Sequence, residues 1–98
     1  MTRYLVNWKA VNSRIAEKQE DRIAQRTAFT QLVQEALKDK SGPLKDWGTI
    51  PDGTRGYAIF EGSEADMARM ANMFLPHIEF EPYPIITADQ FMEVLKSS

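Results

Sequence analysis

The sequence predicts an α+β domain with the order strand, helix, strand, strand, helix, strand, followed by a short closing helix. Short segments rich in β-branched and aromatic residues alternate with longer segments whose apolar residues recur every three to four positions. Turn and helix-capping residues separate these segments. A chain of 98 residues suits one core, so residues 1–98 are expected to form a single domain with an antiparallel sheet.

The first predicted strand covers residues 4–11, which are rich in β-branched and aromatic side chains. A long helix is predicted to follow it and to end at about Lys40. Asn12 or Ser13 can cap that helix, because either side chain accepts a hydrogen bond from the free amides of a first helical turn.

The second half of this helix carries the stripe of a helix that lies on a core. The apolar residues occur at i, i+3, i+4, i+7 and i+8, namely Phe29, Leu32, Val33, Ala36 and Leu37. Continued towards the N-terminus, the same stripe reaches Arg22 and Arg26. The first half of the helix is therefore expected to project past the sheet or to meet another chain.

Gly42 and Pro43 end the helix, because glycine suits a left-handed cap and proline cannot continue helical hydrogen bonding. Residues 44–50 and 55–61 then read as two strands. Turn residues at 51–54 join them into a β-hairpin.

A second helix is predicted from Ser63, which forms a capping-box pattern with Asp66, to Leu75, where Pro76 stops it. Its apolar stripe repeats the spacing of the first helix: Met67, Met70, Ala71, Phe74 and Leu75.

The last predicted strand, residues 78–85, belongs at a sheet edge. Pro82 and Pro84 within it lack the backbone N–H that an inner strand needs. Thr87 and Gln90 form a second capping-box pattern, which indicates a short closing helix with one apolar face.

One face of the predicted sheet has no helix to cover it. Side chains alternate across a strand, and the two long helices can cover only one face. Placing Leu5, Ala58 and Phe60 under the helices leaves an apolar patch on the order of several hundred Å² on the other face. Since symmetric homodimers are the commonest soluble assembly, we expect a second copy to cover this patch. The predicted dimer interface is Tyr4, Val6, Trp8, Tyr57 and Ile59.

Three residues of the last strand are candidate catalytic groups. His77, Glu79 and Glu81 alternate along the strand, and this spacing could aim an imidazole and two carboxylates at one metal ion or one proton. An ordinary edge strand with its acids in water has the same spacing, and no metal site is predicted. Enclosed by a dimer partner, the two acids would line a ligand cavity with aromatic walls: Trp8, Trp47 and Tyr57.

Composition excludes several functions. The chain has no cysteine, so it has no thiolate nucleophile, disulfide or iron–sulfur site. A net charge of −2 gives little attraction for nucleic acid or an anionic membrane. No apolar run is long enough to span a bilayer, and the first residues lack the pattern of a secretory signal, so a cytoplasmic location without a membrane partner is expected. No cofactor is predicted.

Two basic patterns have competing interpretations. Arg14, Lys18, Arg22 and Arg26 recur every four residues, which could favour an anion, but interleaved acids fit a solvated helix with local ion pairs. Residues 55–60 resemble the start of the RNP1 motif of RNA recognition motifs, with Tyr4 as the aromatic of the first strand. However, Ile59 and Gly62 stand where that family has stacking aromatics. Nucleic-acid binding is therefore not favoured.

Three segments carry a resemblance to a known group. They are Asp46-Trp47-Gly48, the turn at 51–57 with the sequence Pro-Asp-Gly-Thr-Arg-Gly-Tyr, and the tail at 78–86. Together they resemble a family of short uncharacterised microbial domains in the dimeric α+β barrel group. The resemblance implies a ferredoxin-like sheet that pairs face to face with its twin, and it carries over no catalytic residues.

The group includes cofactor-free monooxygenases, isomerases, haem-degrading enzymes and ligand-sensing domains, so the architecture alone does not select a function. The leading hypothesis is a homodimer that binds a small, partly apolar ligand between sheet and helices. The alternatives are a cofactor-independent monooxygenase or isomerase, and a degenerate RNA-binding module. The sequence does not decide whether the protein is an enzyme.

Overall fold

Four antiparallel strands form the sheet of the protein, in the order β2-β3-β1-β4. The computed structural model describes residues 2–11, 16–74 and 77–98. The element order is that of the predicted α+β class and is consistent with a ferredoxin-like fold. The elements are β1 (Thr2–Ala10), α1 (Gln19–Lys38), β2 (Leu44–Thr49), β3 (Arg55–Gly62), α2 (Glu64–Phe74), β4 (Ile78–Ile85) and α3 (Ala88–Lys96).

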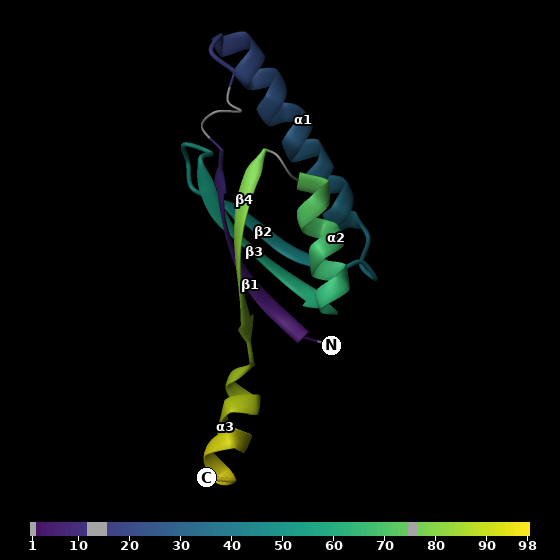
Figure 1. Cartoon of the computed structure of the whole chain (residues 1–98), viewed down its shortest axis with the longest axis vertical. Coiled ribbons are helices and arrows are strands. Elements are labelled where there is room, and N and C mark those ends of the chain that lie inside the picture. Colours follow the sequence, from purple (N-terminus) through teal and green to yellow (C-terminus); the bar gives the residue numbers. More distant parts are fainter. Residues whose placement is uncertain (1, 12–15, 75–76) are drawn as a thin grey trace.

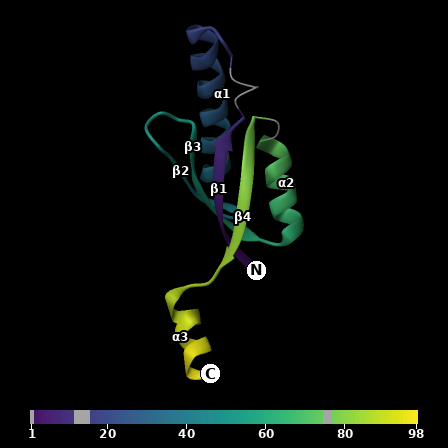
Figure 2. The same ribbon diagram turned by 60° about the vertical axis from the view of Figure 1, so that its left-hand side comes forward.

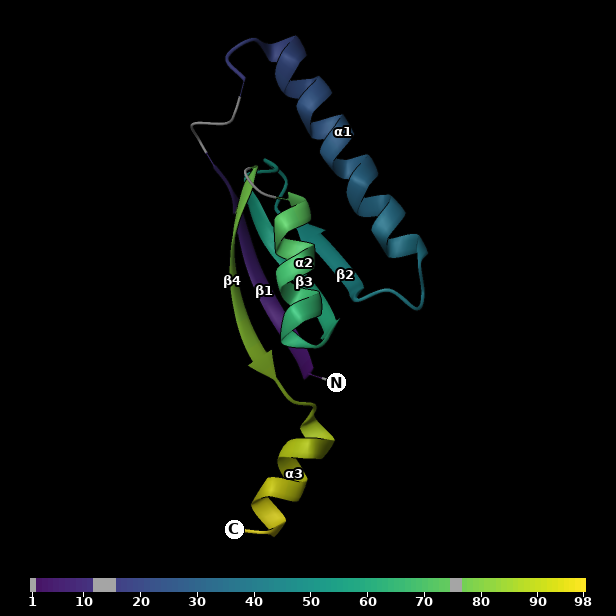
Figure 3. The ribbon, with the colours of Figure 1, turned by 45° about the vertical axis from the view of Figure 1, so that its right-hand side comes forward.

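Helices α1 and α2 lie on the same side of the sheet (Figures 1 and 3), and within the described ranges no helix lies on the other side (Figure 2). The first half of α1 extends past one end of the sheet, as predicted, and α3 lies beyond the opposite end. The molecule is therefore elongated, with extents of 56 × 23 × 21 Å.

Helix α1 begins at Gln19, after an extended Lys18 whose side chain makes no capping hydrogen bond. The predicted caps Asn12 and Ser13 lie outside the described residues, as does Arg14. Most of the predicted stripe contacts the core: Val33 is buried, and Phe29, Ala36 and Leu37 pack against the core. Leu32 is instead 37% exposed.

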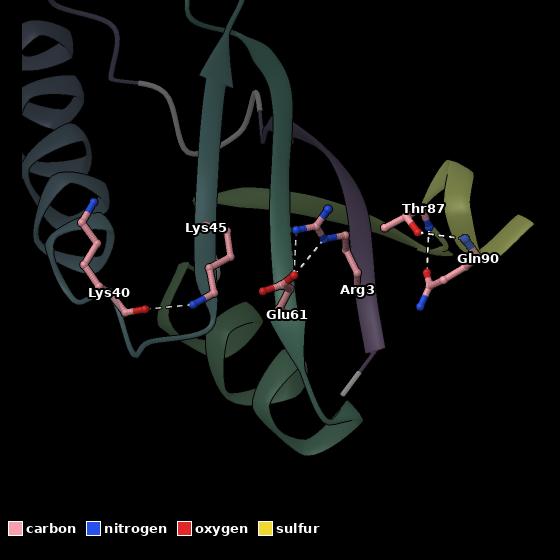
Figure 4. Close-up of polar contacts among 6 residues, drawn as sticks. All are labelled: Arg3, Lys40, Lys45, Glu61, Thr87 and Gln90. Atoms are coloured by element: carbon pink, nitrogen blue, oxygen red, sulfur yellow. Dashed lines mark hydrogen bonds and ion pairs between the residues drawn. The ribbon is translucent and has the colours of Figure 1, made fainter.

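Both predicted capping boxes are present. The Ser63 N–H donates to Asp66 Oδ2 and the Asp66 N–H donates to Ser63 Oγ, each at 3.1 Å. These hydrogen bonds hold the pKa of the Asp66 carboxyl below its ordinary value. In α3 the Thr87 N–H donates to Gln90 Oε1 at 2.8 Å, and the Gln90 N–H donates to Thr87 Oγ1 at 3.1 Å (Figure 4). The predicted end of α2, at Leu75 and Pro76, lies outside the described residues.

Strand β4 lies at a sheet edge, as its prolines predicted. At the opposite edge, the hairpin between β2 and β3 turns at Gly53, whose φ of 77° is a conformation that favours glycine. The Asp52 carboxylate accepts hydrogen bonds from the Thr54 N–H and hydroxyl at 2.9 and 2.7 Å. These contacts hold the tip of the hairpin in one conformation.

The predicted faces of β1 were wrong. Tyr4, Val6 and Trp8 are 7%, 1% and 4% exposed and belong to the core beneath the helices, whereas Leu5 lies on the uncovered face. The reason is register: Tyr4 pairs with Phe60 and Val6 with Ala58, and directly paired residues point to the same side of a sheet. The assignment of Ala58 and Phe60 to the covered face was correct, as was that of Tyr57 and Ile59 to the other.

Candidate functional site

The face of the sheet without helices, here called the open face, presents side chains in rows that the strand register defines. Leu5 pairs with Ile59 on β3 and with Tyr83 on β4, which makes an apolar row across three strands. Leu5 and Ile59 are half-buried and Tyr83 is exposed. The centre of the open face is therefore apolar.

Charged pairs lie on either side of this apolar row. Arg3 and Glu61, on β1 and β3, form an ion pair at 2.7 Å (Figure 4). Lys9 and Glu79, on β1 and β4, form another at 3.4 Å between exposed side chains. Exposed ion pairs add little stability. Arg3–Glu61 lies directly beside the apolar row, whereas the row of Asn7, Tyr57 and Glu81 separates the apolar row from Lys9–Glu79.

A hollow of about 470 Å³ lies next to the apolar row, and we call it the open-face hollow. It brings together four of the five residues that were predicted to bind a ligand, from strands β1, β3 and β4: Trp8, Tyr57, Glu79 and Glu81. Gly56 also lines it, and a Cβ at this position would lie 2.9 Å from the Trp8 ring. The absence of a side chain at Gly56 leaves room for the indole.

Two tyrosine hydroxyls on the open face donate to carboxylates. Tyr57 Oη donates to Asp46 Oδ2 at 2.8 Å, and Tyr83 Oη donates to Glu81 Oε2 at 2.7 Å. These hydrogen bonds raise the pKa of both phenols above the ordinary value, because the neutral form is the donor. At neutral pH both groups are phenols that can share hydrogen bonds with a bound molecule.

Trp47 does not belong to the open-face hollow. It packs on the helix side, where its ring stacks on Trp8 with 4.9 Å between centroids and contacts Phe29 and Phe74. The predicted ligand site is thus divided. Its tyrosine and acids lie on the open face, Trp47 lies in the core, and Trp8 lies at the boundary between the two.

The three candidate catalytic residues do not converge either. Glu79 and Glu81 line the open-face hollow, whereas His77 precedes β4 and lines a different cavity beside α1. Within residues 2–11, 16–74 and 77–98, no three histidine, aspartate or glutamate side chains gather as they would to hold a metal ion. The alternating spacing therefore does not make a common site of these residues.

Sequence reasoning missed two cations of the open-face hollow, Lys9 and Arg55. Lys9 pairs with both Arg55 and Glu79 across the sheet, so all three share one row. Only the register reveals this row, because the three residues lie on different strands. The hollow is consequently of mixed charge and not simply acidic.

Comparison with known protein families places the chain in one of them. The family model described as "Domain of unknown function (DUF3303)" matches residues 2–98. The chain belongs to this family. The match agrees with the resemblance to an uncharacterised family, while the grouping with dimeric α+β barrels stays a prediction. No curated protein matches the chain.

Two further findings concern this DUF3303 domain. In the part of the chain that the structure describes, no helix combines the length and apolarity needed to cross a bilayer. Tyr4, the proposed first-strand aromatic of an RNA-binding surface, is buried beneath the helices and cannot stack on a base. The open face therefore lacks the first-strand aromatic on which the RNA alternative depends, in addition to the third-strand aromatics that Ile59 and Gly62 replace.

The Tyr57–Asp46 hydrogen bond predicts a pH effect in this DUF3303 domain. Because the folded pKa of Tyr57 is raised, the stability that the bond contributes is complete below the unfolded value of about 10 and is lost as pH rises through the folded value. In Asp46→Ala we expect Tyr57 to ionise at lower pH, as followed by phenolate absorbance. The titration step of Tyr83 serves as internal control, and an unchanged curve would contradict this role of Asp46.

Proposed function

We propose that this DUF3303 domain is a homodimer whose two open faces meet and enclose the open-face hollow around a small, partly apolar molecule. The apolar row of Leu5, Ile59 and Tyr83 carries the proposal. It runs across the centre of a sheet face that no helix of the described residues covers, and it lies next to the row that lines the hollow.

Self-pairing is supported by further exposed apolar side chains that follow β4 in the chain. Beyond Tyr83 the chain continues through the exposed Ile86 into α3, which buries none of its residues. The exposed apolar side chains of α3 are Phe91, Met92, Val94 and Leu95. An exposed apolar surface that extends over a sheet and a helix is typical of an interaction site.

The charge pattern also suits a two-fold interface. In such an interface the same patch lies on both sides, so a charged side chain of one copy can meet an opposite charge only if the patch carries both signs. The open face carries both signs at its borders, Arg3 with Glu61 and Lys9 with Glu79. A rotated second copy can thus place opposite charges together around the apolar row.

The ligand chemistry follows from the lining of the hollow. A volume of about 470 Å³ lies within the range of small-molecule sites. Tyr57, Glu79 and Glu81 offer hydrogen-bond donors and acceptors, Lys9 adds a cation, and Trp8 and Phe80 supply apolar surface. A compact molecule with one apolar side and several hydrogen-bonding groups fits this lining, and a second copy would close the hollow to water.

The test of this proposal is a matched pair of lysine substitutions. Ile59→Lys puts a charge at the centre of the apolar row, so we expect the dimer to dissociate with a Kd raised by about tenfold or more. Met73→Lys adds the same charge to an exposed apolar position on α2 and should leave the dimer intact. Light scattering coupled to gel filtration gives the mass of each variant, and circular dichroism verifies the fold.

The outcomes separate the two parts of the proposal. Small molecules that raise the melting temperature of the wild type should also act on Met73→Lys and lose their effect on Ile59→Lys. A monomeric wild type would refute the dimer. Stabilisation that is equal in both variants would show that the ligand binds elsewhere. If Ile59→Lys fails to fold, Tyr83→Lys repeats the experiment at a position that is already about half exposed.

A further inference from the structure

A second cavity of about 310 Å³ lies between the first half of α1 and the end of the sheet, and we call it the sheet–helix cavity. Trp8, Ala10, Val11 and Ile78 line it from the sheet side, and Phe29 and Leu32 line it from α1. Figure 3 shows α1 extending past the end of the sheet, and residues 22–32 of this helix contribute the helical part of the cavity lining. Its lining is mainly apolar, and the carboxylates that line the open-face hollow, Glu79 and Glu81, are not part of it.

Backbone hydrogen bonds fix the floor of this cavity. The Ala10 N–H donates to the Thr54 carbonyl at 2.7 Å, which ties the end of β1 to the hairpin. The Val11 N–H donates to the His77 carbonyl at 3.0 Å, which ties it to the start of β4. These two hydrogen bonds hold the sheet side of the cavity in place, and small-molecule sites are usually largely pre-formed in this way.

Positive charge borders the cavity from α1. Arg22 and Arg26, one helical turn apart, line it together with His77, and its lining contains no aspartate or glutamate. Arg22 donates to the backbone carbonyls of Ala16 and Glu17. In the described ranges 2–11, 16–74 and 77–98, neither arginine belongs to an ion pair.

Arg26 has one acidic neighbour outside the lining. Its guanidinium packs on the turn at Gly53 and contributes to the low pKa of Asp52, which is due first to the hydrogen bond from the Thr54 hydroxyl. Asp52 is exposed and already accepts two hydrogen bonds from Thr54, so donor capacity of Arg26 is left for a ligand.

We propose that the sheet–helix cavity binds a small apolar carboxylate. The apolar body lies against Trp8 and Phe29, and the carboxylate accepts hydrogen bonds from Arg22 and Arg26, whose planar guanidinium groups match carboxylate geometry. A volume near 310 Å³ limits the body to about one aromatic ring with a short chain. This site and its ligand class are distinct from the open-face hollow of the proposed dimer.

The test uses a pair of ligands that differ only in charge, 4-phenylbutyrate and 4-phenylbutan-1-ol. Isothermal titration calorimetry should show that the acid binds about tenfold or more tightly than the alcohol, because only the acid forms charge-assisted hydrogen bonds. Amide shifts in an NMR titration should locate the acid beside Phe29 and Leu32, which line this cavity and not the open-face hollow. Equal affinity for acid and alcohol, or binding of neither, would overturn the proposal.

Matched variants test the arginines. The double variant Arg22→Gln/Arg26→Gln should lower the affinity for the acid by about tenfold or more and leave the affinity for the alcohol unchanged. Lys38→Gln removes one charge from the other end of the same helix and should change neither the affinity for the acid nor that for the alcohol. Arg22 also donates to the backbone carbonyls of Ala16 and Glu17, so its removal could disturb the fold. The single variant Arg26→Gln keeps these hydrogen bonds and tests the charge alone. Wild-type affinity in both arginine variants would refute the assignment.

The two sites can fail independently. Ile59→Lys, designed to separate the dimer, lies on the open face and should retain wild-type affinity for 4-phenylbutyrate. Wild-type affinity of Ile59→Lys for 4-phenylbutyrate supports this inference, whether or not the variant is still a dimer. Loss of acid binding in Ile59→Lys would show that the acid occupies the open-face hollow instead.

Discussion

Phe74→Ala is expected to lower the free energy of unfolding by about 4 kcal/mol. The Phe74 side chain has no exposed surface and lies at the centre of an aromatic cluster. Its ring centroid is 5.4 Å from those of both Phe29 and Trp47, and 6.0 Å from that of Phe80. Removing the ring leaves a cavity that joins α1, α2, β2 and β4. Urea unfolding followed by circular dichroism measures the loss.

The neighbouring residue provides the control. Met73 precedes Phe74 in α2 and is 52% exposed, so Met73→Ala should change the free energy of unfolding by about 0.5 kcal/mol or less. Similar losses in the two variants would mean that Phe74 does not hold the layers together.

Gly56→Ala is expected to destabilise the domain by about 3 kcal/mol. An added Cβ would lie 1.9 Å from the carbonyl oxygen of Gly48 and 2.9 Å from the ring of Trp8. The carbonyl belongs to the paired strand β2, so the hairpin strands must separate to admit the methyl group. Thermal and urea unfolding measure the effect, and the altered backbone should also perturb the open-face hollow.

Gly48→Ala is the matched comparison. There the added Cβ would meet the ring of Tyr57, which is 40% exposed and can turn towards solvent. We expect a smaller loss of stability than in Gly56→Ala, accompanied by rupture of the Tyr57–Asp46 hydrogen bond and a lower pKa of Tyr57. Equal destabilisation in the two alanine variants would contradict the distinction between a backbone and a side-chain obstacle.

Local signals account for the parts of the fold that the sequence predicted correctly. The Ser63–Asp66 and Thr87–Gln90 boxes act over three residues, and Pro82 and Pro84 exclude an inner position for β4 through their own missing N–H groups. Alternation within single strands correctly put Tyr57 with Ile59, and Glu79 with Glu81. Each of these inferences needs only neighbouring residues.

Relations between strands account for the errors. Whether Tyr4 or Leu5 faces the helices depends on its partner in β3, and a shift of one residue exchanges the two faces of a strand. Trp47 shows a second obstacle, since a register irregularity between Leu44 and Asp46 interrupts the alternation of β2. Leu44 and Trp47 consequently both pack into the core although they are three positions apart.

The capping box of α3 has a consequence for assembly. Nine residues without tertiary packing are marginal as a helix, yet Thr87 and Gln90 satisfy its first amides within the helix itself. If the open faces meet as proposed, α3 reaches its partner already ordered, and docking costs less conformational entropy than the folding of a disordered tail. The stability of this helix would then rise with protein concentration, because mass action links the order of the C-terminal segment to the population of dimers.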